Sequence, residues 1–259
     1  MISRSALSAL TVCAWICLRA ETAPDNPDET DIATFLQGAG DGSDVIGGDC
    51  RAADVLAAAR AMLPEKPLEL RGSIVRRGRR GFAKQSCDYL VRLDRGKSPA
   101  TMEVALYKRG DGPRQNRPAG SPIVRETLTR PGKVPEGKIM GTDVTWWDLT
   151  LDFLWWDNPR FEADREGESV HGQKCCVILV SPPDPAPPGI SAVRIWADKR
   201  TGCMMQAEAL DADMKPVRRL WGTRVRKFGE RWMANVLEVE TLGTHHRTKI
   251  LVDELSVEE

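Results

Sequence analysis

The sequence lacks the features that mark most enzymes and most proteins that bind nucleic acid. Its 37 basic and 37 acidic residues cancel, so no overall charge attracts nucleic acid or an anionic membrane. It has no Gly-x-Ser-x-Gly elbow, no phosphate-binding loop and no zinc-type spacing of Cys and His. Only three histidines are present, so acid and base candidates are scarce. We therefore expect a protein that is not an enzyme, with no cofactor, no metal and no catalytic residue.

Two pairs of polar residues need an explanation of their own. His245 and His246 are adjacent in an expected strand, so their side chains face opposite ways and cannot chelate together. Asp148 and Asp152 are four residues apart and would share one face of a helix, as paired carboxylates do. A helix cap and a solvated face explain these two aspartates more simply. Neither pair predicts catalysis.

The first twenty residues predict a secretory signal peptide. Arg4 gives a positive start, residues 6–18 are mostly apolar but too few to span a bilayer, and Ala20 ends an acceptable cleavage site. An uncleaved anchor and a lipoprotein signal are the alternatives, although the residues that precede Cys13 and Cys17 are not small, as a lipoprotein signal requires. We expect cleavage near Ala20 and a periplasmic protein.

The chain after the signal divides into an arm and one domain. Residues 21–48 are acidic and rich in Gly, Pro and Asp, a composition that buries little apolar surface and predicts a flexible arm. Residues 49–259 form the domain. Its first element is an amphipathic helix over 50–62, because apolar residues recur there at helical spacing until Pro64 ends the run.

Beyond Pro67 the apolar period changes to two. Stretches such as 89–93 and 102–106 alternate apolar and polar residues, and turns that contain Gly or Pro separate them, which predicts antiparallel strands. The same pattern resumes from 176 to 257. A flat sheet does not hold about ten such strands, so we expect a strongly curved sheet or a barrel.

Four of the eight tryptophans lie in one segment, 145–157, which reads TWWDLTLDFLWWD. Thr145 and Asp148 form an acceptable capping pair, which favours a short helix. The alternation of apolar and polar residues from Trp147 to Phe153 is instead typical of a strand. We favour the helix. In either conformation this apolar load must be buried in a core or against an apolar ligand.

We expect the aromatic residues to line an apolar ligand cavity. They cannot all pack on one side of a short element, so some should reach the open face of the curved sheet. If alternation holds along the strands, Trp196 and Trp221 point toward the same space. The predicted cavity residues are Trp146, Trp147, Leu151, Phe153, Trp155, Trp156, Trp196 and Trp221. A filled core is the alternative.

Five cysteines follow the predicted cleavage site, and an exported protein enters a compartment where disulfides persist. Cys175 and Cys176 are adjacent in an expected strand, so only one of them can meet a partner on a given side. We expect one of the two to pair with Cys203 across neighbouring strands. Buried thiols are the alternative.

The order of features from Leu68 to Leu255 resembles the LolA-like family of outer-membrane lipoprotein-sorting proteins. GTDVTWWDLTLDFL is similar to the family's Gly-Thr/Ser-Asp and Asp-Leu segment, and IWADKRTGCMMQAEALDADMKPVRRL to its central hairpin. RWMANVLEVETLGTHHRTKILVDEL is similar to its closing strands. Met214 departs from the family pattern, which usually has a turn glycine there. The turn must therefore change type or place Met214 at positive φ.

The resemblance implies a mainly β (α+β) fold, an incomplete antiparallel barrel with short helices over its open side and an apolar cavity for acyl chains. It further implies an envelope carrier that moves a lipoprotein or another lipid toward the outer membrane, with a membrane-bound donor or acceptor protein and without nucleic acid. A lipid-sensing regulatory module of the same fold stays open. So does an enzyme or a structural envelope protein with a filled core.

Overall fold

The computed structural model describes residues 17–18, 29–32, 46, 50–61, 66–77, 83–113, 119–130, 133–184, 186–229, 231–244 and 246–257. Most of the predicted signal peptide, 1–20, and of the predicted arm, 21–48, therefore lies outside the described residues. His245 lies outside them as well.

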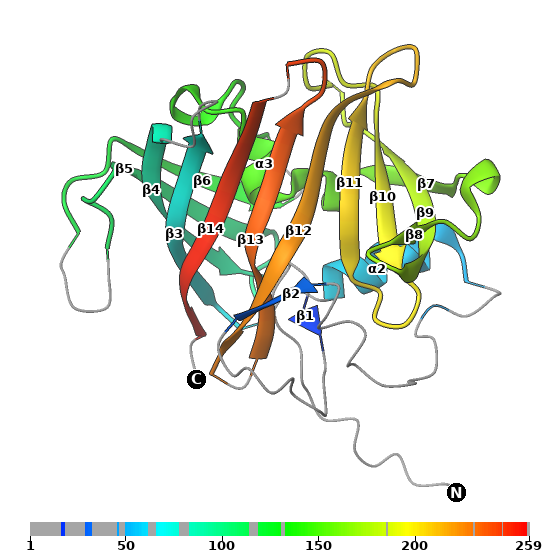
Figure 1. The fold of residues 1–259 in the computed structure, drawn as a ribbon, viewed down its shortest axis with the longest axis horizontal. Coiled ribbons are helices and arrows are strands. Elements are labelled where there is room, and N and C mark those ends of the chain that lie inside the picture. The colour runs from blue at the N-terminus through cyan, green and yellow to red at the C-terminus, as the bar shows by residue number, and fades with distance from the viewer. Residues whose placement is uncertain are drawn as a thin grey trace, which may run out of the picture.

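One curved sheet dominates the fold (Figure 1). Its first strands are β1 (Cys17–Leu18), β2 (Glu29–Asp31), β3 (Leu68–Arg77), β4 (Ala83–Asp94), β5 (Ala100–Lys108) and β6 (Val124–Arg130). Its later strands are β7 (Asp157–Phe161), β8 (Ser169–Val170), β9 (Gln173–Ser181), β10 (Ala192–Asp198), β11 (Met204–Leu210), β12 (Pro216–Phe228), β13 (Arg231–Thr241) and β14 (His246–Val257). The helices are α2 (Ala52–Ala61) and α3 (Trp146–Thr150), with the 3-10 helices η1 (Ile139–Gly141), η2 (Asp152–Trp155) and η3 (Ala163–Arg165).

Two antiparallel meanders make up the sheet. β3 to β6 pair in chain order, and so do β9 to β14. β14 also pairs with β3, with Ile250 opposite Ile74, and this pairing joins the two meanders. The full order is β6-β5-β4-β3-β14-β13-β12-β11-β10-β9-β7. In the described ranges the end strands β6 and β7 do not pair with each other, so the predicted incomplete barrel is confirmed.

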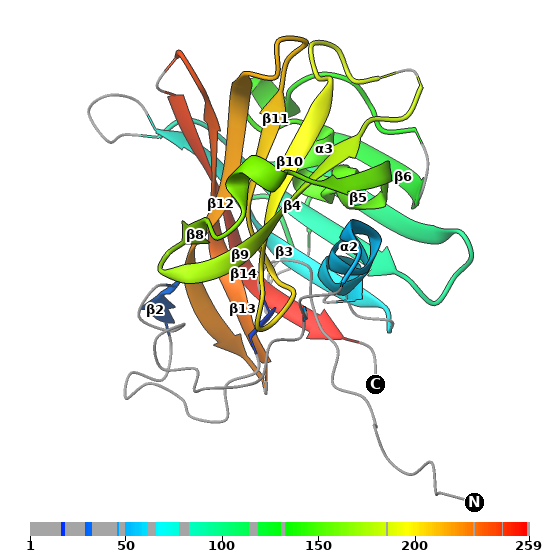
Figure 2. The ribbon, with the colours of Figure 1, turned by 90° about the vertical axis from the view of Figure 1, so that its right-hand side faces the viewer.

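The sheet curves because bulges interrupt its long strands. Register shifts occur after Gly222 in the β12–β13 pair and after Val252 in the β14–β3 pair. Each extra residue bends its strand and increases the local twist. Figure 2 shows that α2 and α3 lie on the inner side of the curve. The curved sheet thereby encloses the helical elements and buries their apolar sides.

α2 confirms the predicted amphipathic helix. Its buried face carries Val55 and Leu56, which pack in the main core, and the helix contacts β7 and β9. Arg95 Nη1 donates to the carbonyl oxygen of Arg60 at 2.8 Å and satisfies one of the last carbonyls of the helix. Within the described ranges, no helix has both the length and the apolar character that a membrane crossing requires.

In the turn between β11 and β12, the structure has the second of the two outcomes expected at Met214, a positive φ. This residue has φ 60°. The side chain of Asp211 stabilises the turn, because its Oδ1 accepts from the backbone N of Asp213 and of Lys215, each at 2.9 Å. An aspartate side chain therefore supports a conformation that glycine adopts more easily.

The predicted disulfide is wrong. Cys175, Cys176 and Cys203 carry thiols, and no disulfide joins the described cysteines. The strand order explains this result, because β10 lies between the strands that carry the two partners. Asp198 of β10 lies opposite Cys175 and donates its backbone N–H to the carbonyl oxygen of Cys203 at 2.8 Å. Two strand spacings of about 5 Å each separate the cysteines, about 10 Å in total. A disulfide joins residues whose Cα atoms are no more than ~7 Å apart.

Native Cys175 should therefore react slowly with iodoacetamide at pH 8. Burial raises the pKa of its thiol to about 12, so only about one thiol in ten thousand is ionised at that pH. Peptide mass spectrometry over time measures the rate, and the urea-unfolded chain is the control. Fast labelling of the native protein, or a Cys175–Cys203 cross-linked peptide, would contradict this expectation.

β3 and β14 approach so closely at Gly72 that no side chain fits between them. A Cβ on Gly72 would lie 1.9 Å from the carbonyl oxygen of Leu251 and 2.7 Å from Oη of Tyr89. The Tyr89 hydroxyl donates to the same carbonyl oxygen at 3.1 Å. Burial raises the pKa of Tyr89 above its ordinary value, so this donor keeps its proton. Gly72 thus permits the strand pairing that joins the meanders.

We expect Gly72→Ala to lower the free energy of unfolding by about 3 kcal/mol, as overpacking of a close contact does. Urea denaturation measures the loss. Adding Tyr89→Phe should not restore stability, because the carbonyl oxygen of Leu251 still meets the new methyl group. A double variant as stable as Tyr89→Phe alone would show that the hydroxyl, and not the strand backbone, excludes the side chain.

Candidate functional site

Residues 145–156 form a compact helical segment, which we call the plug. Thr145 Oγ1 accepts from Asp148 N at 3.3 Å, and Asp148 Oδ2 accepts from Thr145 N at 2.7 Å. These bonds are the capping box that the sequence predicts, so the helix is confirmed. Leu151, at φ 52°, then ends α3 and turns the chain into η2.

The aromatic side chains of the plug pack on one another. The ring of Trp147 meets that of Phe153 edge to face, with centroids 6.2 Å apart and an interplanar angle of 83°. The centroid of Trp156 lies 6.3 Å from that of Trp147. Trp156 Nε1 donates to Asp152 Oδ2 at 3.0 Å, so this buried indole has its polar group satisfied. The plug therefore offers the sheet a continuous apolar side.

A groove on the inner face of the sheet receives the plug. Small side chains, Ala207 and Ala209 of β11, lie opposite the aromatic rings of Trp147 and Phe153. The space left between plug and sheet is about 10 Å³ and is lined by Trp147, Asp148, Phe153, Val193, Ala207, Ala209, Arg218 and Leu220. This volume is at the lower limit for a single water molecule. The plug therefore fills the groove.

Arg218 of β12 fastens the plug to the sheet. Its Nε and Nη2 donate to Oδ2 of Asp148 at 2.9 and 2.7 Å, and Nη2 also donates to the backbone carbonyl of Asp143. Its guanidinium carbon lies 5.7 Å from the centroid of Trp147, within the range of a cation–π contact. One cation on the sheet thus holds the start of the plug through three kinds of contact.

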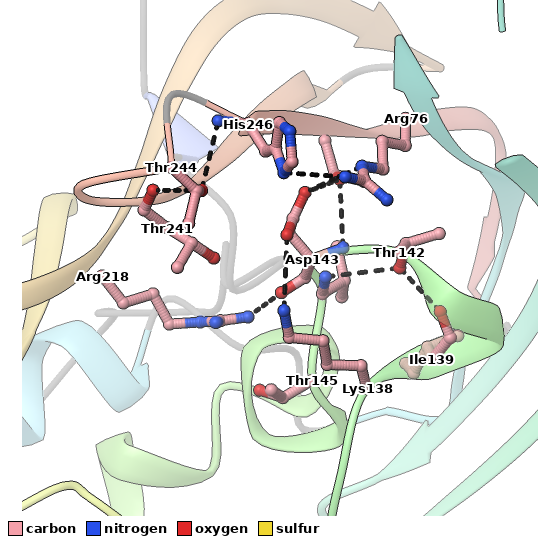
Figure 3. A network of polar contacts seen from close by, with 12 residues as sticks. Arg76, Lys138, Ile139, Thr142, Asp143, Thr145, Arg218, Thr241, Thr244 and His246 are labelled. Carbon is pink, nitrogen blue, oxygen red and sulfur yellow. Dashed lines mark hydrogen bonds and ion pairs between the residues drawn. The ribbon is translucent and has the colours of Figure 1, made fainter. Parts of the chain in front are cut away.

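Asp143 connects the chain before the plug to the strands that join the meanders (Figure 3). Its Oδ2 accepts from Thr248 Oγ1 at 3.2 Å and lies 3.4 Å from Nε of Arg76. Lys138 Nζ lies 3.5 Å from Oδ1. Arg76 in turn contacts Nδ1 of His246 at 2.7 Å. Because Asp143 is buried, these cations and the hydroxyl compensate its charge.

The structure brings six of the eight predicted cavity residues together in the plug: Trp146, Trp147, Leu151, Phe153, Trp155 and Trp156. Trp147 and Trp155 are half-buried, and the other four are buried. All six belong to or pack against the main core, and Trp147 and Phe153 border the groove. Their contact with a ligand remains a prediction.

The remaining two, Trp196 and Trp221, lie on the outer face of the sheet. Trp196 and Trp221 occupy matching register positions on either side of Gln206 of β11. Val193 and Ala207 of the same strands border the groove, and side chains alternate between faces along a strand. The two tryptophans therefore line a separate outer cleft of about 650 Å³.

Two aspartates that the sequence placed on a solvated face are buried instead. Asp148 is 1% exposed and Asp152 is 6% exposed, and each has a hydrogen-bond donor within the protein. Their expected solvation was wrong because the helix packs into the sheet on this side. Sequence reasoning also missed Arg218, which is 70 residues from Asp148. One sequence signal was available: Arg218 is two residues before the apolar Leu220 in the same strand, so both side chains lie on the same, buried face.

Solved structures of other proteins share this fold. A DUF1329 family protein from Desulfovibrio piger has a TM-score of 0.59 and 14% identity, covering 80% of this chain and 92% of that one. A domain from Vibrio parahaemolyticus that is named for outer membrane lipoprotein sorting has a TM-score of 0.57 and 13% identity, covering 80% and 93%. A LolA superfamily protein from Nitrosomonas europaea has a TM-score of 0.57 and 12% identity, covering 81% and 94%. At these identities the likeness shows the fold.

Matches found by sequence cover less of the chain than these structures do. No curated protein matches the chain. A family model described as an uncharacterized protein matches residues 121–259, which is more than half of the chain and includes every strand from β6 to β14. The chain therefore belongs to this family of uncharacterized proteins, and its fold is the one that the LolA superfamily shares.

Proposed function

We propose that this protein is an envelope carrier that binds the acyl chain of a lipoprotein or another lipid in the groove and transfers it toward the outer membrane. In this proposal residues 1–20 direct export to the periplasm, 21–48 form a flexible arm and 49–259 form the carrier domain. The fold shared with lipoprotein-sorting proteins supports a carrier. The observation that carries the proposal is an apolar groove filled by a short helical segment of the chain itself.

The groove is suited to an acyl chain once the plug moves. Withdrawal of Trp147 and Phe153 would leave a mostly apolar trough, formed by the methyl groups of Ala207 and Ala209 with Leu220 and the guanidinium of Arg218 beside them. A hydrocarbon chain there gains about 0.8 kcal/mol per buried methylene. Several methylenes therefore replace the contacts of the two rings without any specific polar contact.

The plug is built so that a ligand can displace it. α3 has five residues and η2 has four, so neither is stable without its packing. The ion pair between Arg218 and Asp148 is buried, and the desolvation of both charges cancels much of their attraction. Thr150 Oγ1 is buried without a hydrogen-bond partner among the described residues, which costs about 1–3 kcal/mol.

A structural envelope protein with a filled core is the second candidate. The observation that favours it is the space of about 10 Å³ beneath the plug, which holds no ligand while the plug stays in place. The two functions differ in one physical respect, namely whether the plug leaves the groove when lipid is offered.

The net contribution of the ion pair can be measured with a double-mutant cycle. Arg218→Met leaves a buried carboxylate and Asp148→Asn leaves a buried guanidinium, so each should lower the free energy of unfolding by about 3–5 kcal/mol. The double variant should recover most of this loss, because no unpaired charge remains. Urea denaturation of all four proteins gives the coupling. Fully additive losses would contradict a plug that is only weakly held.

Loosening the plug should accelerate lipid binding. Asp148→Asn keeps an acceptor for the helix cap but removes the charge that holds Arg218. We expect a dansyl fatty acid to bind at least about tenfold faster than to the native protein, because the ~1.4 kcal/mol that corresponds to this factor is only part of the ~3–5 kcal/mol that the variant loses. Energy transfer from tryptophan to dansyl in stopped flow measures the rate.

The matched control is Asp164→Asn, which removes an exposed carboxylate that does not line the groove and should leave the rate unchanged. Trp147→Leu, which thins the plug and keeps both charges, is a second accelerating variant should Asp148→Asn unfold. Circular dichroism confirms folding. If the folded native protein and both plug variants fail to bind the probe, the filled-core candidate is correct and the carrier is not.

A further inference from the structure

We propose that the outer cleft binds a molecule that carries an oxyanion, a carboxylate or a phosphate, beside an apolar body. The cleft lies on the face of β10, β11 and β12 opposite to the groove, so this inference stands whether or not the groove binds lipid. Its volume of about 650 Å³ is within the range of about 300–1,000 Å³ that small-molecule sites occupy.

The carboxylates of Glu208 and Glu162 are already matched to arginines. Glu208 is buried, and its two oxygens lie 3.2 Å from Nη1 of Arg194 and 2.8 Å from Nη2 of Arg219. Glu162 holds the other side of Arg194 through two hydrogen bonds, which raise the pKa of this guanidinium. These acidic groups therefore do not call for a cation from solution.

The carboxylate of Glu168 is also matched to donors. Arg165 Nη1 donates to Glu168 Oε1 at 2.7 Å, and Trp196 Nε1 donates to Glu168 Oε2 at 2.8 Å. Both oxygens of this carboxylate thus have a donor. In the described part of the chain, the buried side-chain atoms of the cleft that have no hydrogen-bond partner are nitrogen atoms, which favours a ligand that supplies acceptor oxygens.

Two cleft residues carry buried nitrogen atoms without a hydrogen-bond partner in the described part of the chain: Nε of Arg165 and Nε2 of His171. Nε of Arg165 lies 3.7 Å from Oε2 of Glu162, beyond hydrogen-bonding distance. A buried donor left without an acceptor costs about 1–3 kcal/mol. In this proposal the oxyanion accepts from Nε of Arg165 and from Nε2 of His171, in the tautomer that carries its proton on Nε2, and removes that cost.

The backbone conformation at His171 also supports a contact between this residue and the ligand. β8 and β9 are joined by a two-residue turn in which His171 has φ 50° and Gly172 has φ 78°. Turns with positive φ at both central residues favour Asn or Gly at the first of them. The hairpin holds the imidazole of His171 where it lines the cleft and has one buried nitrogen. We infer that this position serves contact with the ligand.

Two tryptophans of the cleft are the reason for proposing an apolar part of the ligand. Trp196 and Trp221 line the cleft beside the unused donors, and Trp221 remains half-buried. Arg194 lies 5.7 Å from the ring centroid of Trp196, and Arg247 lies 5.5 Å from that of Trp221. An organic group attached to the oxyanion can therefore contact indole while the oxyanion meets the cationic side chains.

Calorimetric titration of the full chain tests the proposal with phenyl phosphate and benzoate as probes. Benzyl alcohol, which lacks the oxyanion, and inorganic phosphate, which lacks the apolar body, should bind more weakly. Arg165→Met and His171→Asn should each weaken binding of the better probe at least about tenfold, the loss expected for one charge-assisted hydrogen bond. Asn tolerates the positive φ at 171, and Arg160→Met, on the exposed strand β7, is the matched control that should bind normally.

Vesicle cosedimentation separates the two sources of the oxyanion. Binding to phosphatidylglycerol but not phosphatidylcholine vesicles, lost in Arg165→Met and kept in Arg160→Met, supports a lipid headgroup. Binding of the soluble probes with the same pattern supports a small organic anion. If neither soluble probe nor vesicle binds, or if Arg165→Met and His171→Asn bind as well as the native protein, the proposal is overturned.

Discussion

The buried charge of Arg218 is the constraint on which the inner arrangement of this protein depends. A guanidinium on the inner face of a sheet must be neutralised, because an unpaired charge in the interior is very unfavourable. Asp148 and the carbonyl of Asp143 neutralise it, and both belong to the chain at the start of the plug. The position of α3 follows from that requirement. The rings of Trp147 and Phe153 then lie over the small side chains of β11.

The strands β10, β11 and β12 carry two kinds of chemistry because their side chains alternate between faces. The inner face has Val193, Ala207 and Leu220, and it accepts an apolar segment. The outer face has Arg194 and Glu208 in an ionic network between the hairpin of β8 and the neighbouring strands. The apolar groove and the polar cleft thus lie on opposite faces of the same three strands. A ligand for one site has no reason to resemble a ligand for the other.

Several features were predictable because they depend on short stretches of chain. The period of two along the strands, the helix before Pro64 and the capping box at Thr145 all rest on neighbouring residues, and all appear in the structure. The positive φ of Met214 was one of the two outcomes that the departure from the family pattern predicted for its turn. The fold class could be inferred as well, since many strands with short turns have few ways to bury their apolar faces.

Other features required the register and order of the strands. The inferred cavity placed Trp196 beside the plug, but its position in β10 turns it to the outer face. The inferred disulfide failed because β10 separates Cys175 from Cys203. Both errors came from treating apolar or sulfur-bearing residues as partners without knowing which strand lay between them. Strand pairing over long sequence separations has no local signature.

The amino-acid sequence by itself determined the elements, because backbone conformation, helix capping and turn geometry depend on residues a few positions apart. It also determined that the tryptophans of the plug had to be buried, because so much apolar surface is unfavourable in water. Only the tertiary structure decided that Arg218 meets Asp148 and that the groove is filled by the plug. It likewise decided that His171 borders an outer cleft. These contacts join residues from separate strands and loops, and the packing of the whole curved sheet sets their distances.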